Sequence, residues 1–236
     1  RFYFISDDEL LSVLGSSEAS SIQVHMLKLF DNVKELKFSD GEKNTVVSGM
    51  VSSEQEWFDF AKPSPVNGAV EKWMTLAEAA MVDSLRAITK KGVYDYAFAD
   101  HRTDWLQRPE TLGMVSLCGS QIWWTWEVED AFRAIEVDGE KDSIKALASK
   151  LTGQLNDLVS LIREDLDKIT RKKINTMLII DVHARDIVDR FVEDEVVSKN
   201  EFAWESQLRF YWVKELDDCE INQCTGSFRY GYEYMG

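Results

Sequence analysis

The sequence has little cysteine, with only three in 236 residues, and no histidine stands at zinc-ligand spacing from them. Cys118, Cys219 and Cys224 form no CxxC pair, and their odd number argues against a disulfide framework or a structural zinc site. Reduced cysteines, as in a cytosolic compartment, are therefore expected.

Basic residues are also scarce, because 27 Lys and Arg stand against 42 Asp and Glu, for a net charge of −15. Binding to nucleic acid depends on clustered basic side chains that release counterions, so this balance opposes it. Uncharged apolar runs such as Met177–Ile180 are far too short to span a bilayer. The sequence predicts an acidic globular chain with no nucleic-acid and no membrane partner.

The motifs of common enzyme classes are missing as well. The sequence contains no GxxxxGK[ST] phosphate loop, GxSxG elbow, HExxH motif or EF-hand loop. His183, with Asp186 three residues on, could form half of a nucleophile-activating triad, but no Ser or Cys is placed to complete it. No catalytic, cofactor-binding or metal-binding residue is predicted. His183 is interpreted as a partly buried helix-packing residue held by Asp186, with a hydrolase that uses this pair as an alternative.

Helical periodicity dominates what is present. A capping box at Ser6 predicts a short helix that ends at Gly15. Apolar residues three and four positions apart predict a second helix from about Ser20 whose stripe runs to Val33, and a third over residues 68–91 that ends at Gly92.

The middle of the chain predicts longer helices. One is expected to begin at Pro109 and to bury a stripe that includes Trp123 and Trp126, with Gly119 where a neighbouring helix crosses closely. A near-heptad seam runs from Ile144 to Ile169 and requires a partner helix, which we expect after Thr170.

Two regions show the shorter period of strands. Residues 44–60 predict a small β element, closed by Pro63 and Pro65, and residues 208–236 predict a C-terminal β-hairpin. At the end of the chain four aromatic residues alternate with other residues, which predicts that one face of a strand carries them all and packs on the helical body. These four residues are Phe228, Tyr230, Tyr232 and Tyr234.

The predicted fold class is therefore mainly α. Three segments are expected: N-terminal helices with the small β element over residues 1–66, a long-helix bundle over 67–207, and the C-terminal hairpin over 208–236.

Five blocks of sequence stand out in order along the chain. They are Phe2-Tyr3-Phe4 with Ser6 to Leu11, Gly119 to Thr125 with Glu127 to Glu129, Asp181 to Asp186, Trp204 with Gln207 to Trp212, and Tyr230 to Gly236. Together these blocks resemble the linker region of dynein heavy chains, of axonemal rather than cytoplasmic type, and the resemblance covers essentially the whole chain.

This resemblance implies a place in the C-terminal part of the linker, immediately before the first AAA+ module of the motor ring. It implies an elongated helical arch that acts as a lever, has no ATP or Mg²⁺ site of its own, and couples ATP hydrolysis in the ring to movement. It also implies the ring, other dynein subunits and microtubules as partners, and a cytoskeletal location in the axoneme of cilia or flagella. A passive helical scaffold that binds a partner protein is the alternative that the residues alone leave open.

Overall fold

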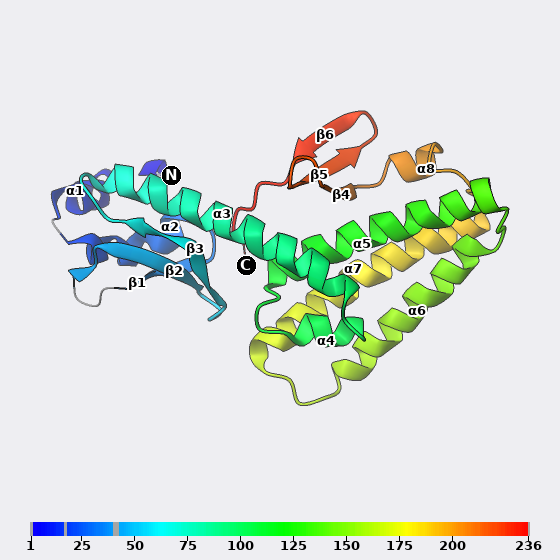
Figure 1. Ribbon diagram of the computed structural model, residues 1–236. Coiled ribbons are helices and arrows are strands. Elements are labelled where there is room, and N and C mark those ends of the chain that lie inside the picture. The colour runs from blue at the N-terminus through cyan, green and yellow to red at the C-terminus, as the bar shows by residue number, and fades with distance from the viewer. Residues whose placement is uncertain (1, 17, 40–42, 236) are drawn as a thin grey trace. The chain divides into compact units, whose positions relative to one another are not determined.

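The computed structural model describes residues 2–16, 18–39 and 43–235. The chain forms two compact units, one of Arg1–Ile88 with Gly231–Gly236 and the other of Thr89–Tyr230. Helices make up 58% of it, and the strands belong to two three-stranded antiparallel sheets, one in each unit (Figure 1). This confirms the mainly α class with small β elements. The arch stays a prediction.

The first helix, α1 (Asp7–Gly15), begins as predicted. The Ser6 hydroxyl accepts a hydrogen bond from the Glu9 N–H at 3.4 Å, and the Glu9 carboxylate accepts one from the Ser6 N–H at 3.2 Å. The acidic first turn also suits the positive end of the helix dipole. A short 3₁₀ turn, η1 (Phe2–Phe4), precedes it.

The second helix is much shorter than predicted. A 3₁₀ segment, η2 (Ala19–His25), leads into a single α-turn, α2 (Met26–Leu29). Asn32 then adopts a left-handed φ of 55°, which a continuing helix does not allow, and Val33 opens a strand instead. The prediction that a helical stripe extends to Val33 is therefore wrong.

The first sheet has the order β1 (Val33–Phe38), β2 (Val46–Ser52), β3 (Trp57–Pro65). Strands β2 and β3 confirm the predicted β element. Strand β1 was not predicted, because half of its residues are Lys or Glu. Pro63 and Pro65 lie inside β3 rather than after it, which the sheet tolerates because β3 is an edge strand.

The third helix, α3 (Val70–Ala97), continues past Gly92, where it was predicted to end. Gly92 has a packing role instead of a capping role: a Cβ on it would lie 2.4 Å from a methyl carbon of Val115. Its carbonyl also accepts a hydrogen bond of 3.0 Å from the indole N–H of Trp105. Close approach of side chains, and not helix termination, therefore explains this glycine.

The second unit consists of helices followed by a sheet. Pro109 lies in a turn before α5 and does not open it as predicted, since the Thr111 N–H donates to the Arg108 carbonyl and the helix starts at Gly113. The short helix α4 was not predicted. The elements are α4 (Arg102–Gln107), α5 (Gly113–Arg133), the π-turn η4 (Ala134–Asp138), α6 (Ser143–Leu161), α7 (Lys168–Glu193) and α8 (Phe202–Glu205).

The predicted seam from Ile144 to Ile169 is divided between two helices. Helix α6 ends at Leu161, and Asp167 caps α7, because its carboxylate accepts the N–H groups of Ile169 and Thr170 at 2.9 and 3.0 Å. The partner helix expected near Thr170 is present, and α6 and α7 pack side by side (Figure 1).

Aromatic side chains fill the core at one end of this helical body. The indole of Trp204 packs within about 6 Å of the rings of Trp124, Phe132 and Phe191. Trp126 was predicted to belong to the buried stripe of α5, but its side chain is 56% exposed, and Trp124 is buried instead.

The second sheet has the order β4 (Arg209–Val213), β5 (Asp218–Gln223), β6 (Gly226–Arg229). Strand β6 pairs with β5, which in turn pairs with β4, so the hairpin predicted for residues 208–236 is part of a three-stranded sheet. Because β4 packs on α5, the sheet belongs with the helices. The contacts therefore divide the chain differently from the three segments drawn from the sequence.

Candidate functional site

A buried ion pair joins three helices in the second unit. The guanidinium of Arg102 on α4 donates two hydrogen bonds to the carboxylate of Asp181 on α7, at 2.5 and 2.9 Å, and a third to the hydroxyl of Ser120 on α5, at 3.1 Å. The two charged side chains are only 11% and 12% exposed. We call these three residues the Arg102 cluster.

Burial and pairing act in opposite directions on this arginine. Burial opposes the charged form of Arg102, but the hydrogen bonds and the charge of Asp181 outweigh it and raise the pKa of the guanidinium. The guanidinium therefore stays charged, and its two parallel bonds to Asp181 fix both the distance and the orientation of α4 relative to α7.

Aromatic residues lie beside the Arg102 cluster, because Tyr96 and Trp124 line the same small cavity as its three residues. The ring of Tyr96 on α3 stacks on Trp123 at 5.3 Å and meets the edge of Trp105 at 5.1 Å. Burial raises the pKa of Tyr96 to about 12, so the phenol is neutral. Because the two charged side chains of the cluster are nearly buried, their ion pair is less screened than one at a surface.

Two basic residues in the first turns of α7, Arg171 and Lys173, also have partners. Lys173 is buried and donates to the carbonyl of Thr111 at 2.7 Å, while Arg171 donates to the carbonyls of Ile162 and Glu164, both at 2.9 Å. These cations satisfy carbonyls at the end of α6 and in the turn before α5. This explains why basic residues occur where the helix dipole disfavours them.

Glu129 on α5 anchors the C-terminal segment. Its carboxylate accepts hydrogen bonds from the Tyr211 hydroxyl at 2.6 Å and the Trp204 indole at 3.3 Å. Burial of Tyr211, followed by its hydrogen bond to Glu129, raises the pKa of its hydroxyl. The Thr125 hydroxyl accepts the Phe210 N–H at 3.0 Å. Helix α5 is thereby tied to both α8 and β4.

The four C-terminal aromatic residues do not share one face of a strand, as had been predicted. Strand β6 ends at Arg229, and Tyr232 has a left-handed φ of 49°, which breaks the alternation. Phe228 is 61% exposed, and Tyr230 lies beside Phe210 at 6.4 Å.

Tyr232 and Tyr234 are buried in the first unit instead. The Tyr234 hydroxyl donates to the Glu56 carboxylate at 2.6 Å, and its ring lies 6.1 Å from that of Phe58 on β3. Burial, and then the charge of Glu56, raise the pKa of Tyr234. The last aromatic residues thus bind the first sheet.

His183 and Asp186 are not a pair. The Asp186 carboxylate accepts two hydrogen bonds from Arg185, at 3.0 and 2.6 Å, and His183 is exposed on α7. Their spacing of three residues suggested a pair on one face of the helix, but the arginine between them is the stronger partner for a carboxylate. The interpretation of His183 as a buried packing residue is therefore wrong.

The other predicted site residues, Trp123 and Trp126, form the wall of a cleft of about 500 Å³ between α5, the end of α3 and β4. The Trp123 indole donates to the Val93 carbonyl at 2.9 Å, and Trp126 packs against its edge at 5.6 Å. Within the part of the chain that the structure describes, no three His, Cys, Asp or Glu side chains are grouped to hold a metal ion.

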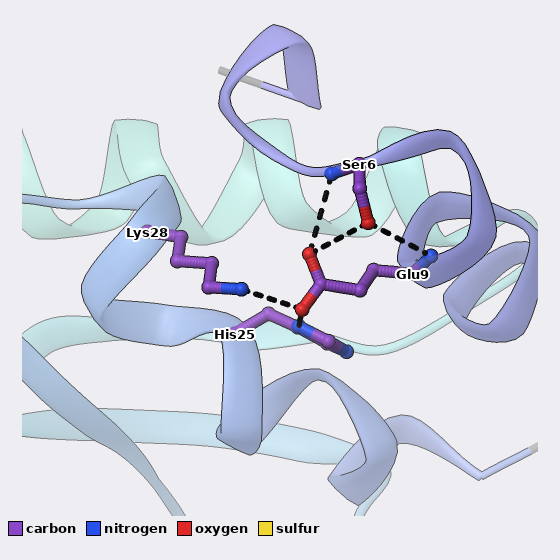
Figure 2. Close-up of polar contacts among 4 residues, drawn as sticks. All are labelled: Ser6, Glu9, His25 and Lys28. Carbon is purple, nitrogen blue, oxygen red and sulfur yellow. Dashed lines mark hydrogen bonds and ion pairs between the residues drawn. The ribbon is translucent and has the colours of Figure 1, made fainter.

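A second polar cluster ties the N-terminal helices together (Figure 2). The Glu9 carboxylate accepts hydrogen bonds from Lys28 at 2.5 Å and from the Ser6 hydroxyl at 3.0 Å, and the His25 Nδ1 atom lies 3.7 Å away. The bond from Lys28, followed by those from Ser6, lowers the pKa of Glu9 to about 2.

The acidic residues of α5 and of the turn after it have partners within the chain. Besides Glu129, the Glu127 carboxylate binds Lys150 at 2.9 Å, Asp130 binds Arg133 at 2.8 Å, and Glu136 accepts the Ser198 hydroxyl at 2.6 Å. Among the helices described, none is both long enough and apolar enough to cross a membrane.

Comparison of the sequence with known proteins shows the family of this chain. Residues 1–92 match the family model "Dynein heavy chain, N-terminal region 2". The whole chain is 59% identical to the Dynein-1-alpha heavy chain of the flagellar inner arm I1 complex of Chlamydomonas reinhardtii, 50% identical to human Dynein axonemal heavy chain 10, and 38% identical to the ciliary Dynein beta chain of Tripneustes gratilla. In each case it spans only 5% of the relative's length.

The chain therefore belongs to the dynein heavy chains. Within them it is part of the N-terminal region that includes the linker, and the predicted linker region of axonemal type is confirmed at that level. Because these relatives are flagellar, ciliary and axonemal proteins, they also confirm the predicted cytoskeletal location in the axoneme.

Proposed function

We propose that the chain is a mechanical lever: the C-terminal part of a dynein linker, which transmits ATP-driven changes in an AAA+ ring to movement along microtubules. Family membership over the full length of the chain supports this role. The ring of the same heavy chain, other dynein subunits and, through the parent complex, microtubules are its proposed partners. ATP and Mg²⁺ belong to the ring, and this segment is proposed to be non-catalytic and to need no cofactor.

The Arg102 cluster is the observation that carries the proposal. A lever must keep its shape under load, and close-packed interiors with low compressibility transmit strain. Separating α4 from α7 would leave the buried charges of Arg102 and Asp181 without partners, which is costly. An interaction with this geometry resists sliding of the helices, which non-directional apolar contacts alone resist less.

The geometry argues against the hydrolase alternative, and an experiment separates the lever from the scaffold. A hydrolase would need His183 oriented by Asp186, and Arg185 occupies that carboxylate instead. A passive scaffold would have the same fold, but loosening its interior would leave the coupling between hydrolysis and movement unchanged. The two remaining roles, lever and scaffold, therefore differ in a measurable ratio.

The test uses the parent heavy chain with Asp181→Asn. We expect microtubule gliding to slow more than ATP turnover, because the ring still hydrolyses ATP but the loosened segment transmits less displacement. Asp142→Asn, which removes one member of the exposed Asp142–Lys145 pair, is the matched control and should leave both rates unchanged. Wild-type rates for both quantities in a folded Asp181→Asn protein would contradict the lever role.

A further inference from the structure

Two buried thiols face each other between α5 and the second sheet. The sulfur atoms of Cys118 on α5 and Cys219 on β5 are 3.9 Å apart, and both side chains are buried, whereas Cys224 is exposed. Cys219 lies on the central strand of its sheet, and 101 residues separate the two cysteines in sequence. We propose that Cys118 and Cys219 are a modification site, at which a disulfide-type oxidant forms a reversible covalent bond between α5 and β5.

The position of the pair makes bond formation feasible. A disulfide bond has a length of about 2.05 Å, so the sulfur atoms must approach each other by roughly 2 Å. The backbone at Cys219 is held in place, because its N–H donates to the Asp218 carboxylate and its carbonyl accepts the Tyr230 N–H, both at 2.9 Å. The approach is therefore a matter of side-chain rotation and a small shift of α5 against the sheet.

The surroundings of the two thiols decide which of them reacts with the oxidant first. Cys118 lines a cleft of about 470 Å³ whose wall also includes Gln121, Phe210 and Tyr230, while Cys219 is fully buried behind it. An oxidant that enters the cleft meets Cys118 first, because Cys118 lines the cleft and Cys219 does not. The hydrogen bond with Cys219, followed by burial, raises the pKa of the Cys118 thiol, so the reactive thiolate is rare and the first step is slow at neutral pH.

The reaction with a disulfide of the glutathione class balances as two exchanges. The Cys118 thiolate attacks one sulfur of the oxidant, the S–S bond of the oxidant breaks, and one glutathione thiolate leaves. The Cys219 thiolate then attacks the Cys118 sulfur in the mixed disulfide, and the second glutathione leaves. The protein loses two electrons and two protons, and the oxidant becomes two thiols.

The bond would fasten the central strand of the second sheet to α5 by a route separate from the contacts of Glu129. It closes a long loop, and cross-links of long loops restrict the unfolded chain strongly. The inference concerns the chemistry of this pair alone and does not depend on the lever role.

The test uses the full chain with Cys224→Ser, which removes the exposed thiol. After incubation with oxidised glutathione, we expect the intact mass to fall by two hydrogens and a non-reduced peptide map to link Cys118 to Cys219. No thiol should react after unfolding in denaturant, and the thermal midpoint should rise by roughly 5 °C or more. Dithiothreitol should reverse all of these changes.

A second variant checks the order of the steps. In Cys219→Ser with Cys224→Ser, Cys118 has no partner, so we expect a stable glutathione adduct on Cys118 that dithiothreitol removes. Two reactive thiols in the oxidised and then unfolded Cys224→Ser chain would overturn the proposal. So would a stable glutathione adduct on Cys118 of that chain with Cys219 still reduced.

Discussion

The guanidinium of Arg102 and the carboxylate of Asp181 are joined by two hydrogen bonds of 2.5 and 2.9 Å, although 79 residues separate them in sequence. Both side chains are almost fully withdrawn from water. A pair of this kind matters most when one member is removed, because the remaining charge is then buried without a partner.

Replacing Asp181 with Asn should therefore lower the free energy of unfolding by about 3 kcal/mol. Urea unfolding of the 236-residue chain measures this. The double variant Arg102→Met with Asp181→Leu should recover a large part of the loss, since no buried charge is left. The exposed control Asp142→Asn should change the stability by less than about 1 kcal/mol. An Asp181→Asn chain as stable as wild type would show that the pair is not structurally important.

Replacement by alanine at two helical glycines should change the stability of the chain in opposite directions. A Cβ at Gly92 would clash with Val115, so Gly92→Ala should destabilise the chain by about 1–3 kcal/mol. At Gly153 in α6 there is nothing within 4 Å of the added carbon, so Gly153→Ala should stabilise it by about 0.5–1 kcal/mol. Thermal melts of both variants give the comparison. Equal effects of the same sign would mean that helix propensity, and not the approach of Val115, decides the behaviour of Gly92.

Part of the stability of the chain should depend on pH through the ionisation of Glu9. Its pKa is about 2 in the folded chain against an ordinary value of 4.5, so its contribution is complete above about pH 4.5 and is lost as the pH falls through about 2. The difference in urea midpoint between wild type and Glu9→Gln should therefore shrink as the pH is lowered over this range. Lys28→Met, which removes the main cause of the shift, should behave like Glu9→Gln. A difference that stays constant with pH would contradict this account.

The hydroxyl of Tyr234 should stabilise the first unit. Tyr234→Phe leaves the ring against Phe58 but removes the hydrogen bond to Glu56, so we expect a loss of about 1–2 kcal/mol. Tyr94→Phe, at a 43% exposed tyrosine, is the control and should have little effect. Chemical unfolding measures both variants. Equal stability of the two variants would argue against a role for the Glu56 contact.

Local patterns in the sequence predicted local structure well. The capping box at Ser6 and the strands near residues 44–60 depend on residues that are neighbours along the chain, and both are present. Gly119 was expected at a close crossing, and the ring of Trp105 lies 3.1 Å from where its Cβ would be. For the capping box and the strands, chemistry between neighbours along the chain decides the outcome, whereas the crossing at Gly119 is a contact between two helices.

Long-range contacts left no local pattern. Arg102 was not singled out, and Asp181 was named only as the first residue of a sequence block, because nothing near either residue indicates a partner 79 positions away. Gly92 looked like a cap because the contact that explains it comes from Val115 on another helix. The alternation of Phe228 to Tyr234 predicted a strand, but burial of Tyr232 and Tyr234 against other partners overrode it. Tertiary packing overrides local preference at these positions.

The lever role is tested most directly by distances measured in the parent motor in different nucleotide states. Spin labels at two exposed positions of the second unit, Lys145 and Phe98, report its shape, and a third label in the AAA+ ring reports its position. The lever account predicts that the distance from Lys145 to Phe98 stays constant between the ATP-bound and nucleotide-free states while the distance from Lys145 to the ring changes. A constant distance to the ring, or a second unit that changes shape itself, would contradict it.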